Sequence, residues 1–410
     1  MSENNIVDEC GWRIDCIVSR VVEAIRKLPS TAHGLNKHLS ILPKELLREV
    51  AGRLTEREVG LLAKSYADPP AKVAELLSLV DPSKLSSVDV VERVYEILMV
   101  RGFPREAASF AERGIELSGG QAASRFRAMA SLARAMSMVG DAEVLHEQGR
   151  HDEEYSLLSR AMEDYVEAYR NYMEVGMARE ANEAKALGLR AMAQYHFTHG
   201  NIGEARSMYI QCSSALRWIE EDSQEALECI ALAKLCEAME ESSSELYEEA
   251  GDLLMKASQG NPELLELAVM AYGAALQVSQ DRGDLYAKYF TALVSHVDYL
   301  INVELGGFGE FSNILKSECV DGASRRLNIP AEAIKAYLTA KALTAVYGIE
   351  GFKAALIMAG MGMNLLDSDR DAIMGVLKGL NLDVGRLNDA YSMLSSIAGP
   401  CLRPQPPQGP

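Results

Sequence analysis

The sequence predicts an all-α protein: an irregular α-solenoid of stacked antiparallel helical hairpins with flanking helical domains. Apolar residues form 48% of the chain but aromatic residues only 6%, and alanine, the strongest helix former, is abundant. Apolar residues recur at helical spacing in many segments, whereas no segment alternates apolar and polar residues as a half-buried strand would. Short turns separate these segments, so consecutive helices are expected to pack antiparallel.

Residues 1–85 are expected to form short amphipathic helices, because prolines interrupt this part of the chain repeatedly. One helix is predicted over 14–28. A hairpin is predicted over 42–66, with Pro43 in a first helical turn. Its leucine pattern consists of Leu42-Pro43, Glu45-Leu46-Leu47, Leu54 and Leu61-Leu62. This pattern resembles the opening of an F-box, which implies an adaptor that recruits substrates to a ubiquitin ligase.

Residues 86–305 are expected to form the hairpin array. The clearest helix spans 152–175, where Leu158, Tyr165 and Tyr172 belong to one apolar stripe, and Gly176 ends it. A second helix is predicted to run to about 199 and a third to about 219, with Gly200 in the turn between them. Four more helices are predicted at 222–240, 242–258, 262–280 and 283–304.

One 34-residue unit, 186–219, carries a repeat pattern of large, small, glycine, alanine, aromatic and small residues. These positions hold Leu189, Ala193, Gly200, Ala205, Tyr209 and Cys212. The unit resembles a tetratricopeptide repeat, a family of helical hairpins that bind peptides on an inner surface. The resemblance implies that Arg190, Gln194 and Phe197, on the first helix of the unit, bind a partner.

Gly306, Gly307 and Gly309 predict a boundary, followed by a helical region at 306–400 with helices at 330–348, 351–366 and 370–398. The apolar run 352–366 is too short to span a membrane. It is the predicted surface for homo-oligomer formation, with Met361 and Leu365 as contacts. Residues 401–410 contain four prolines and are expected to be a disordered tail.

The charge distribution restricts the partners. A net charge of −18 argues against nucleic acid and anionic lipid, which are polyanions. Twelve acidic residues against the single Lys234 lie between Glu220 and Asp252. Such a stretch is typical of a solvated helix face, and the alternative interpretation is a docking surface for a basic protein partner. Seven cysteines occur without a Cys-x-x-Cys pair, so no disulfide framework is expected. A reducing, cytoplasmic location is predicted.

No catalytic, metal or cofactor site is predicted. His196 and His199 could share a helix face, but no cysteine or acidic residue lies at a matching spacing near them. The run 367–371 imitates the start of a calcium-binding EF-hand loop. Ala372 replaces the glycine that the loop needs and Lys378 its closing glutamate, so a helix N-terminus is the better interpretation.

The leading functional hypothesis is a non-enzymatic scaffold or adaptor that binds a peptide or helix of a partner protein through a solenoid groove. Two alternatives remain open. One is an all-helical enzyme whose carboxylates meet only in three dimensions. The other is an F-box-type adaptor acting through residues 42–66.

Overall fold

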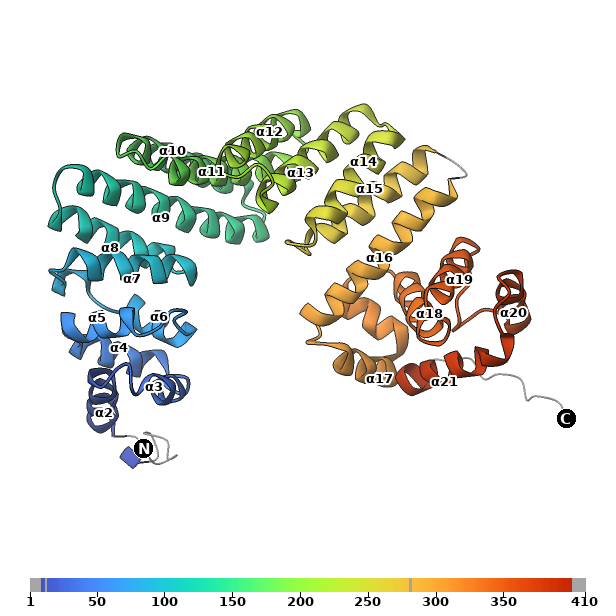
Figure 1. The fold of residues 1–410 in the computed structure, drawn as a ribbon, viewed down its shortest axis with the longest axis horizontal. Coiled ribbons are helices and arrows are strands. Elements are labelled where there is room, and N and C mark those ends of the chain that lie inside the picture. Colours follow the sequence, from blue (N-terminus) through green and yellow to red (C-terminus); the bar gives the residue numbers. More distant parts are fainter. Residues whose placement is uncertain (1–8, 12, 280–281, 400–410) are drawn as a thin grey trace. The chain divides into compact units, whose positions relative to one another are not determined.

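The computed structural model describes residues 9–11, 13–279 and 282–399 (Figure 1). Within these residues all regular structure is helical and consecutive helices pack against each other, so the all-α, solenoid-like prediction is confirmed. Residues 401–410, the predicted tail, lie outside the described residues. Contacts divide the chain into two units, Met1–Glu221 and Asp222–Pro410. The sequence-based boundaries after residues 85 and 305 stay predictions.

The first unit begins with short helices that pack around a shared apolar core. They are α2 (Ile14–Arg26), α3 (Ala32–Leu39), α4 (Lys44–Arg53), α5 (Glu56–Lys64), α6 (Ala71–Ser78) and the 3₁₀ turn η1 (Pro82–Lys84). Helix α2 packs on α3, α4 and α5. A capping box between Thr55 and Glu58 begins α5. Both α4 and α5 pack on α2, α4 also on α6 and α5 also on α7 (Val88–Val100), so the segment 42–66 is helical as expected. The F-box resemblance stays a prediction.

Longer antiparallel helices follow, each packed on the next (Figure 1). They are α7 (Val88–Val100), α8 (Pro104–Leu117), α9 (Gly120–Glu147), α10 (His151–Glu174), α11 (Ala178–Thr198) and α12 (Ile202–Ile219). Ala193, Ala205 and Tyr209 of the tetratricopeptide-like unit are buried, as close packing of α11 on α12 requires. In α10, Tyr165 and Tyr172 are buried, whereas Tyr155, on the same predicted stripe, is exposed.

Four turns in this series share one backbone geometry. Each contains a glycine with φ between +70° and +78°: Gly102, Gly149, Gly176 and Gly200. The amides of this glycine and of the next residue donate hydrogen bonds to carbonyls in the last turn of the preceding helix. The following helix begins two residues after the glycine. A left-handed conformation favours glycine, so these four positions set the hairpin geometry.

The residue five positions after each turn glycine faces the preceding helix. Three of these residues are alanines with no exposed surface: Ala107, Ala181 and Ala205. Their small side chains allow the two helices to approach closely. After Gly149 the same position is occupied by Glu154, which is 5% exposed. The chain therefore buries a carboxylate where its other hairpins of this geometry bury a methyl group.

The second unit continues with antiparallel helices and ends in a helical bundle. Its helices are α13 (Gln224–Glu241), α14 (Ser244–Ala257), α15 (Leu264–Val278), α16 (Gly283–Val303), α17 (Phe308–Leu327), α18 (Ala331–Tyr347), α19 (Ile349–Gly360), α20 (Arg370–Gly379), η2 (Val384–Arg386) and α21 (Leu387–Ala398). Helices α13 to α16 pack in sequence, and α21 returns to pack on α17 and α18 (Figure 1). Asp369 caps α20, as a helix N-terminus at 367–371 requires.

The helix predicted over 351–366 ends at Gly360, because the chain turns at Gly362 with φ +67°. Met361 is 62% exposed, whereas Leu365 is 2% exposed and belongs to the core. Of the two residues predicted for self-association, only Met361 is therefore accessible. The role of 352–366 in a homo-oligomer stays a prediction.

The expectation that the cysteines form no disulfides is wrong. Cys10 and Cys16 are bonded, with Cα atoms 5.6 Å apart, because the chain turns at Gly11 before α2 begins. Cys212, Cys229 and Cys319 are also disulfide-bonded. The cytoplasmic location stays a prediction.

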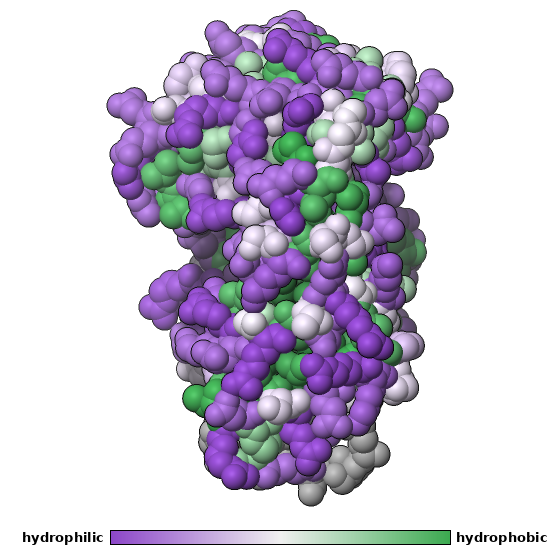
Figure 2. All heavy atoms as spheres, turned by 90° about the vertical axis from the view of Figure 1, so that its left-hand side faces the viewer, coloured by the Kyte–Doolittle hydropathy of each residue, from purple (hydrophilic) through white to green (hydrophobic). Residues whose placement is uncertain are grey.

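The face drawn in Figure 2 is mainly polar. Hydrophobic side chains lie there in narrow strips between the hydrophilic ones. Among the described residues, no helix is both long and apolar enough to cross a membrane.

Candidate metal centre

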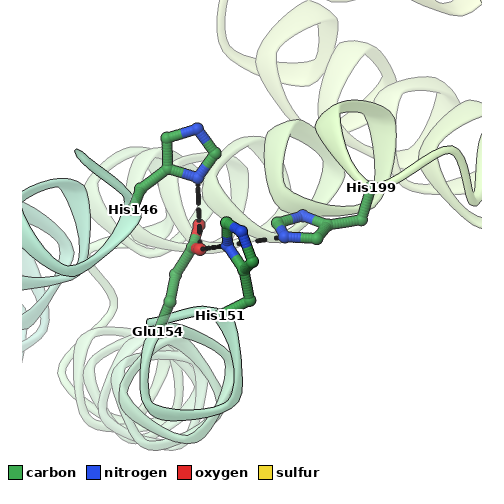
Figure 3. A group of neighbouring side chains, drawn as sticks. All are labelled: His146, His151, Glu154 and His199. Atoms are coloured by element: carbon green, nitrogen blue, oxygen red, sulfur yellow. Dashed lines mark hydrogen bonds and ion pairs between the residues drawn. The ribbon is translucent and has the colours of Figure 1, made fainter. Parts of the chain in front are cut away.

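Four side chains of the first unit converge on one point: three imidazoles and a carboxylate (Figure 3). His146 lies near the end of α9, His151 and Glu154 lie in the first turns of α10, and His199 directly follows α11. One nitrogen or oxygen atom from each side chain lies within 4.8 Å of those of the other three. Imidazole nitrogens and carboxylate oxygens are common ligands of transition metals in proteins.

The repeated glycine turn brings these residues together. The turn at Gly149 places His146 before it and His151 and Glu154 after it. Helix α10 packs antiparallel on α9 and on α11, so the chain returns to the same end of the hairpins after two helices. There α11 ends at the turn containing Gly200, and His199 points toward Glu154 (Figure 3).

Glu154 is the centre of the cluster. Nδ1 of His146 lies 3.1 and 3.2 Å from its two carboxylate oxygens, and Nδ1 of His151 lies 3.2 Å from Oε2. Nε2 of His199 lies 3.9 Å from Oε2. No lysine or arginine among the described residues forms an ion pair with this carboxylate. A buried carboxylate is costly without a positive partner, and in the part of the chain that the structure describes the imidazoles are the groups close enough to provide one or to share one.

A hydrogen bond on the side of the His199 ring away from Glu154 determines which ring nitrogen carries the hydrogen. Nδ1 lies 2.8 Å from the carbonyl oxygen of Tyr195. A carbonyl only accepts, so Nδ1 carries the hydrogen, and in the neutral ring Nε2 presents a lone pair to Glu154. The Tyr195 ring stacks on His199 with centroids 4.1 Å apart, which fixes the plane of the imidazole. A lone pair facing a carboxylate is stable only with a proton or a cation between them.

The cluster is open to solvent on one side. The side chains of His146 and His151 are 45% and 50% exposed, against 6% for Glu154. A cavity of about 300 Å³ is lined by two members of the cluster, His146 and Glu154. Its wall includes Glu154, Gln194 and Tyr195 together with the apolar Val139 and Leu158. An ion could therefore enter from the solvent and reach the buried carboxylate.

The donor set suits a borderline metal ion. Zinc forms bonds of about 2.1 Å to imidazole nitrogen and carboxylate oxygen, which in a tetrahedral site separates the ligand atoms by about 3.4 Å. The imidazole nitrogens lie 3.1, 3.2 and 3.9 Å from the Glu154 oxygens, and all four ligand atoms lie within 4.8 Å of one another. Small side-chain rotations would thus complete a tetrahedral site. Calcium and magnesium fit poorly, because they prefer oxygen ligands.

Sequence reasoning found only one member of this cluster. His199 belongs to it, whereas His196 does not: its Nδ1 lies 3.4 Å from the side-chain amide of Asn201. The sequence shows only which acidic residues lie close to His199 along the chain, whereas Glu154, 3.9 Å from Nε2 of His199, comes from the neighbouring hairpin. Its sequence signal is the glutamate five residues after Gly149, where equivalent turns have alanine.

The three residues predicted to bind a partner lie on α11. Arg190 and Gln194 are exposed and Phe197 is half-buried. Gln194 lines the cavity beside the histidine cluster, whereas Arg190 and Phe197 do not. One residue of the predicted partner-binding face, Gln194, thus lines the cavity beside the candidate metal centre.

Comparison with known proteins identifies no relative, so the functional proposal rests on the geometry of the histidine cluster. The tetratricopeptide resemblance accordingly stays a prediction. No protein-family model matches this chain, and no curated protein shows significant similarity to it.

Proposed function

We propose that this chain is a non-enzymatic helical-repeat protein that binds one divalent transition-metal ion, with zinc as the best-fitting candidate. The ligands are His146, His151, Glu154 and His199. The observation that carries the proposal is the buried Glu154 carboxylate, which stands at an alanine position of the hairpin and is surrounded by three imidazoles. The position of Nδ1 of His199 on a backbone carbonyl supports it, because metal-binding histidines are commonly oriented in this way.

The metal would act as a clamp between hairpins. His146, His151 and Glu154 flank the α9–α10 turn, and His199 adjoins the α11–α12 turn. An ion held by all four would join the two turns. A ligand that binds only the folded chain stabilises it by about 2.7 kcal/mol when present at about 100 times its Kd. The proposed role of the ion is therefore structural.

The test is zinc titration of metal-stripped full-length protein, measured by calorimetry and by competition with a chromophoric chelator. The wild-type chain should bind one equivalent. Glu154→Gln should weaken binding by about 100-fold, because it removes the ligand charge while keeping the side-chain shape. Glu153→Gln is the matched control: its carboxylate is 59% exposed and pairs with Arg150, outside the cluster.

A second matched pair separates coordination from folding. His199→Ala should weaken zinc binding strongly, whereas His196→Ala, three residues earlier on the same helix, should leave it unchanged. Circular dichroism would establish that each variant is folded. Equal losses in His199→Ala and His196→Ala, or the absence of stoichiometric binding by the wild-type chain, would overturn the proposal.

We also propose that the array binds a basic peptide or helix of a partner protein in the cytoplasm. The exposed Arg190 and Gln194 on α11 support a peptide-binding face on the first unit. A stoichiometric partner should be retained at low salt and released at high salt. The double variant Arg190→Ala/Gln194→Ala should lose it, and Gln211→Ala on α12 should not.

A further inference from the structure

A cavity of about 470 Å³ lies in the second unit, apart from the metal ligands. Helices α15, α16 and α18 and the turn after α19 form its walls. Pockets that hold small organic molecules in proteins have volumes of about 300 to 1,000 Å³. The cavity is therefore large enough for a small organic ligand.

The walls are mainly apolar and rich in aromatic and sulfur-containing side chains. Tyr286, Tyr289 and Phe290 come from α16, and Met270 and Met363 contribute from α15 and from the turn after α19. The Tyr286 and Tyr289 rings lie side by side, with centroids 6.0 Å apart. Aromatic faces carry partial negative charge, so they attract both apolar groups and cations.

The charged groups on the wall are all acidic. Glu266 of α15 and Glu332 of α18 line the cavity, and among the described residues no lysine or arginine does. Glu332 lies in the first turn of α18, where its carboxylate offsets the positive end of the helix dipole. Lys335, which does not line the cavity, lies 3.6 Å from Glu332 and 2.8 Å from Asp367. The wall therefore disfavours an anionic ligand.

His296 adds a hydrogen-bonding group without adding positive charge. It lines the cavity and is 9% exposed, and its Nδ1 has no hydrogen-bond partner. Burial lowers the pKa of His296, although nearby Glu266 opposes the shift. The ring is thus neutral at physiological pH and keeps one lone pair, which can accept a hydrogen bond from an ammonium group.

We propose that this cavity binds a small amphipathic organic cation, an amine with an apolar or aromatic body. The body would pack against Tyr286, Tyr289 and Phe290, and the ammonium group would lie toward Glu266. This ligand class follows from an apolar, aromatic wall whose charged groups, within the described part of the chain, are the carboxylates of Glu266 and Glu332. The proposal is independent of zinc binding, since no residue is shared between the two sites.

Three probes with one body and different charge test the proposal: phenylbutylamine, phenylbutanol and phenylbutyrate. Binding to the full-length chain would be measured by calorimetry and by NMR of the ligand. The amine should bind more tightly than the alcohol, and the alcohol more tightly than the acid. Equal or tighter binding of the acid would overturn the proposal, and so would the absence of amine binding.

Variants locate the ligand. Glu266→Gln should weaken amine binding by about fivefold, as expected for a solvent-screened ion pair, and leave alcohol binding unchanged. Glu304→Gln, an exposed carboxylate outside the cavity, should change neither. Ala336→Leu should weaken all three probes, because the larger side chain fills the cavity. Unchanged amine binding in both Glu266→Gln and Ala336→Leu would contradict the assignment.

Discussion

At the scale of single residues, the two buried glutamates of the first unit differ in their partners. Glu58 is 3% exposed, and its carboxylate lies 2.6 Å from Nε of Arg26 and accepts hydrogen bonds from Thr55. Glu154 is equally buried but is surrounded by imidazoles alone. A guanidinium is always charged, whereas an imidazole supplies positive charge only by binding a proton or a metal ion. This difference singles out Glu154.

Helix glycines that pack against aromatic rings should resist substitution. A Cβ atom on Gly251 of α14 would lie 2.5 Å from the Tyr272 ring of α15. We expect Gly251→Ala to destabilise the second unit by about 1–3 kcal/mol, since the clash exceeds the gain in helix propensity of about 1 kcal/mol. Denaturant unfolding measures the change.

Gly375→Ala is the control for this substitution. Gly375 lies within α20, and a Cβ atom there would meet open space. The variant should be more stable than the wild-type chain by up to about 1 kcal/mol. A stabilising Gly251→Ala would show that α14 and α15 pack less closely than described.

His296 predicts a pH dependence of stability in the second unit. Burial lowers the pKa of His296 in the folded chain. As the pH falls below about 6.5, the imidazole is therefore protonated in the unfolded state before it is protonated in the folded state. Stability should therefore fall as the pH drops from about 7 to about 5. His296→Phe should lose less stability over this range, as denaturant midpoints at each pH would show. Parallel pH profiles for the two proteins would contradict the prediction.

At the scale of elements, the glycine turns determine how accurately the helix ends could be predicted from the sequence. The ends of α10 and α11 lie close to prediction, because Gly176 and Gly200 end both helices. The helix expected over 351–366 stopped early at a turn whose glycine looked like part of an apolar run. A glycine followed five residues later by an alanine is not sufficient by itself to predict a turn between helices. Gly188 and Ala193 have this spacing, but both lie inside α11.

The candidate metal centre was less predictable than the helices. Local patterns identify His199 at a helix end, but they do not determine which residues of other hairpins lie beside it. Glu154 reaches His199 only because two turns lie at the same end of the hairpins. The sequence signal for Glu154 comes from comparing the four glycine turns, because a glutamate stands where the other three turns have alanine. The signal can be used only after the four turns have been recognised as equivalent.

Zinc should change the dynamics of two turns and leave a third unchanged. Amide hydrogen exchange should slow at residues 145–154 and 196–201 on adding zinc, because the ion would join the α9–α10 and α11–α12 turns. The Gly176 turn, at the other end of α10, is the internal control. Glu154→Gln should abolish the protection. Equal protection at the Gly176 turn would argue for a general effect of zinc instead.

At the scale of the whole molecule, each proposed site lies within one unit. The histidine cluster belongs to Met1–Glu221 and the apolar cavity to Asp222–Pro410. Each unit has an apolar core of its own. The chain therefore offers two binding sites of different chemistry on one helical framework, and the metal centre carries the main functional proposal.

Zinc X-ray absorption spectroscopy of the full-length chain loaded with one equivalent of zinc tests that proposal most directly. The proposed ligands predict a first shell of about four nitrogen and oxygen atoms at about 2.0–2.1 Å, with outer-shell scattering from imidazole rings. Glu154→Gln should alter this shell or lose the metal. Sulfur ligands at about 2.3 Å, or a shell of oxygen atoms without imidazole scattering, would contradict the proposed metal centre.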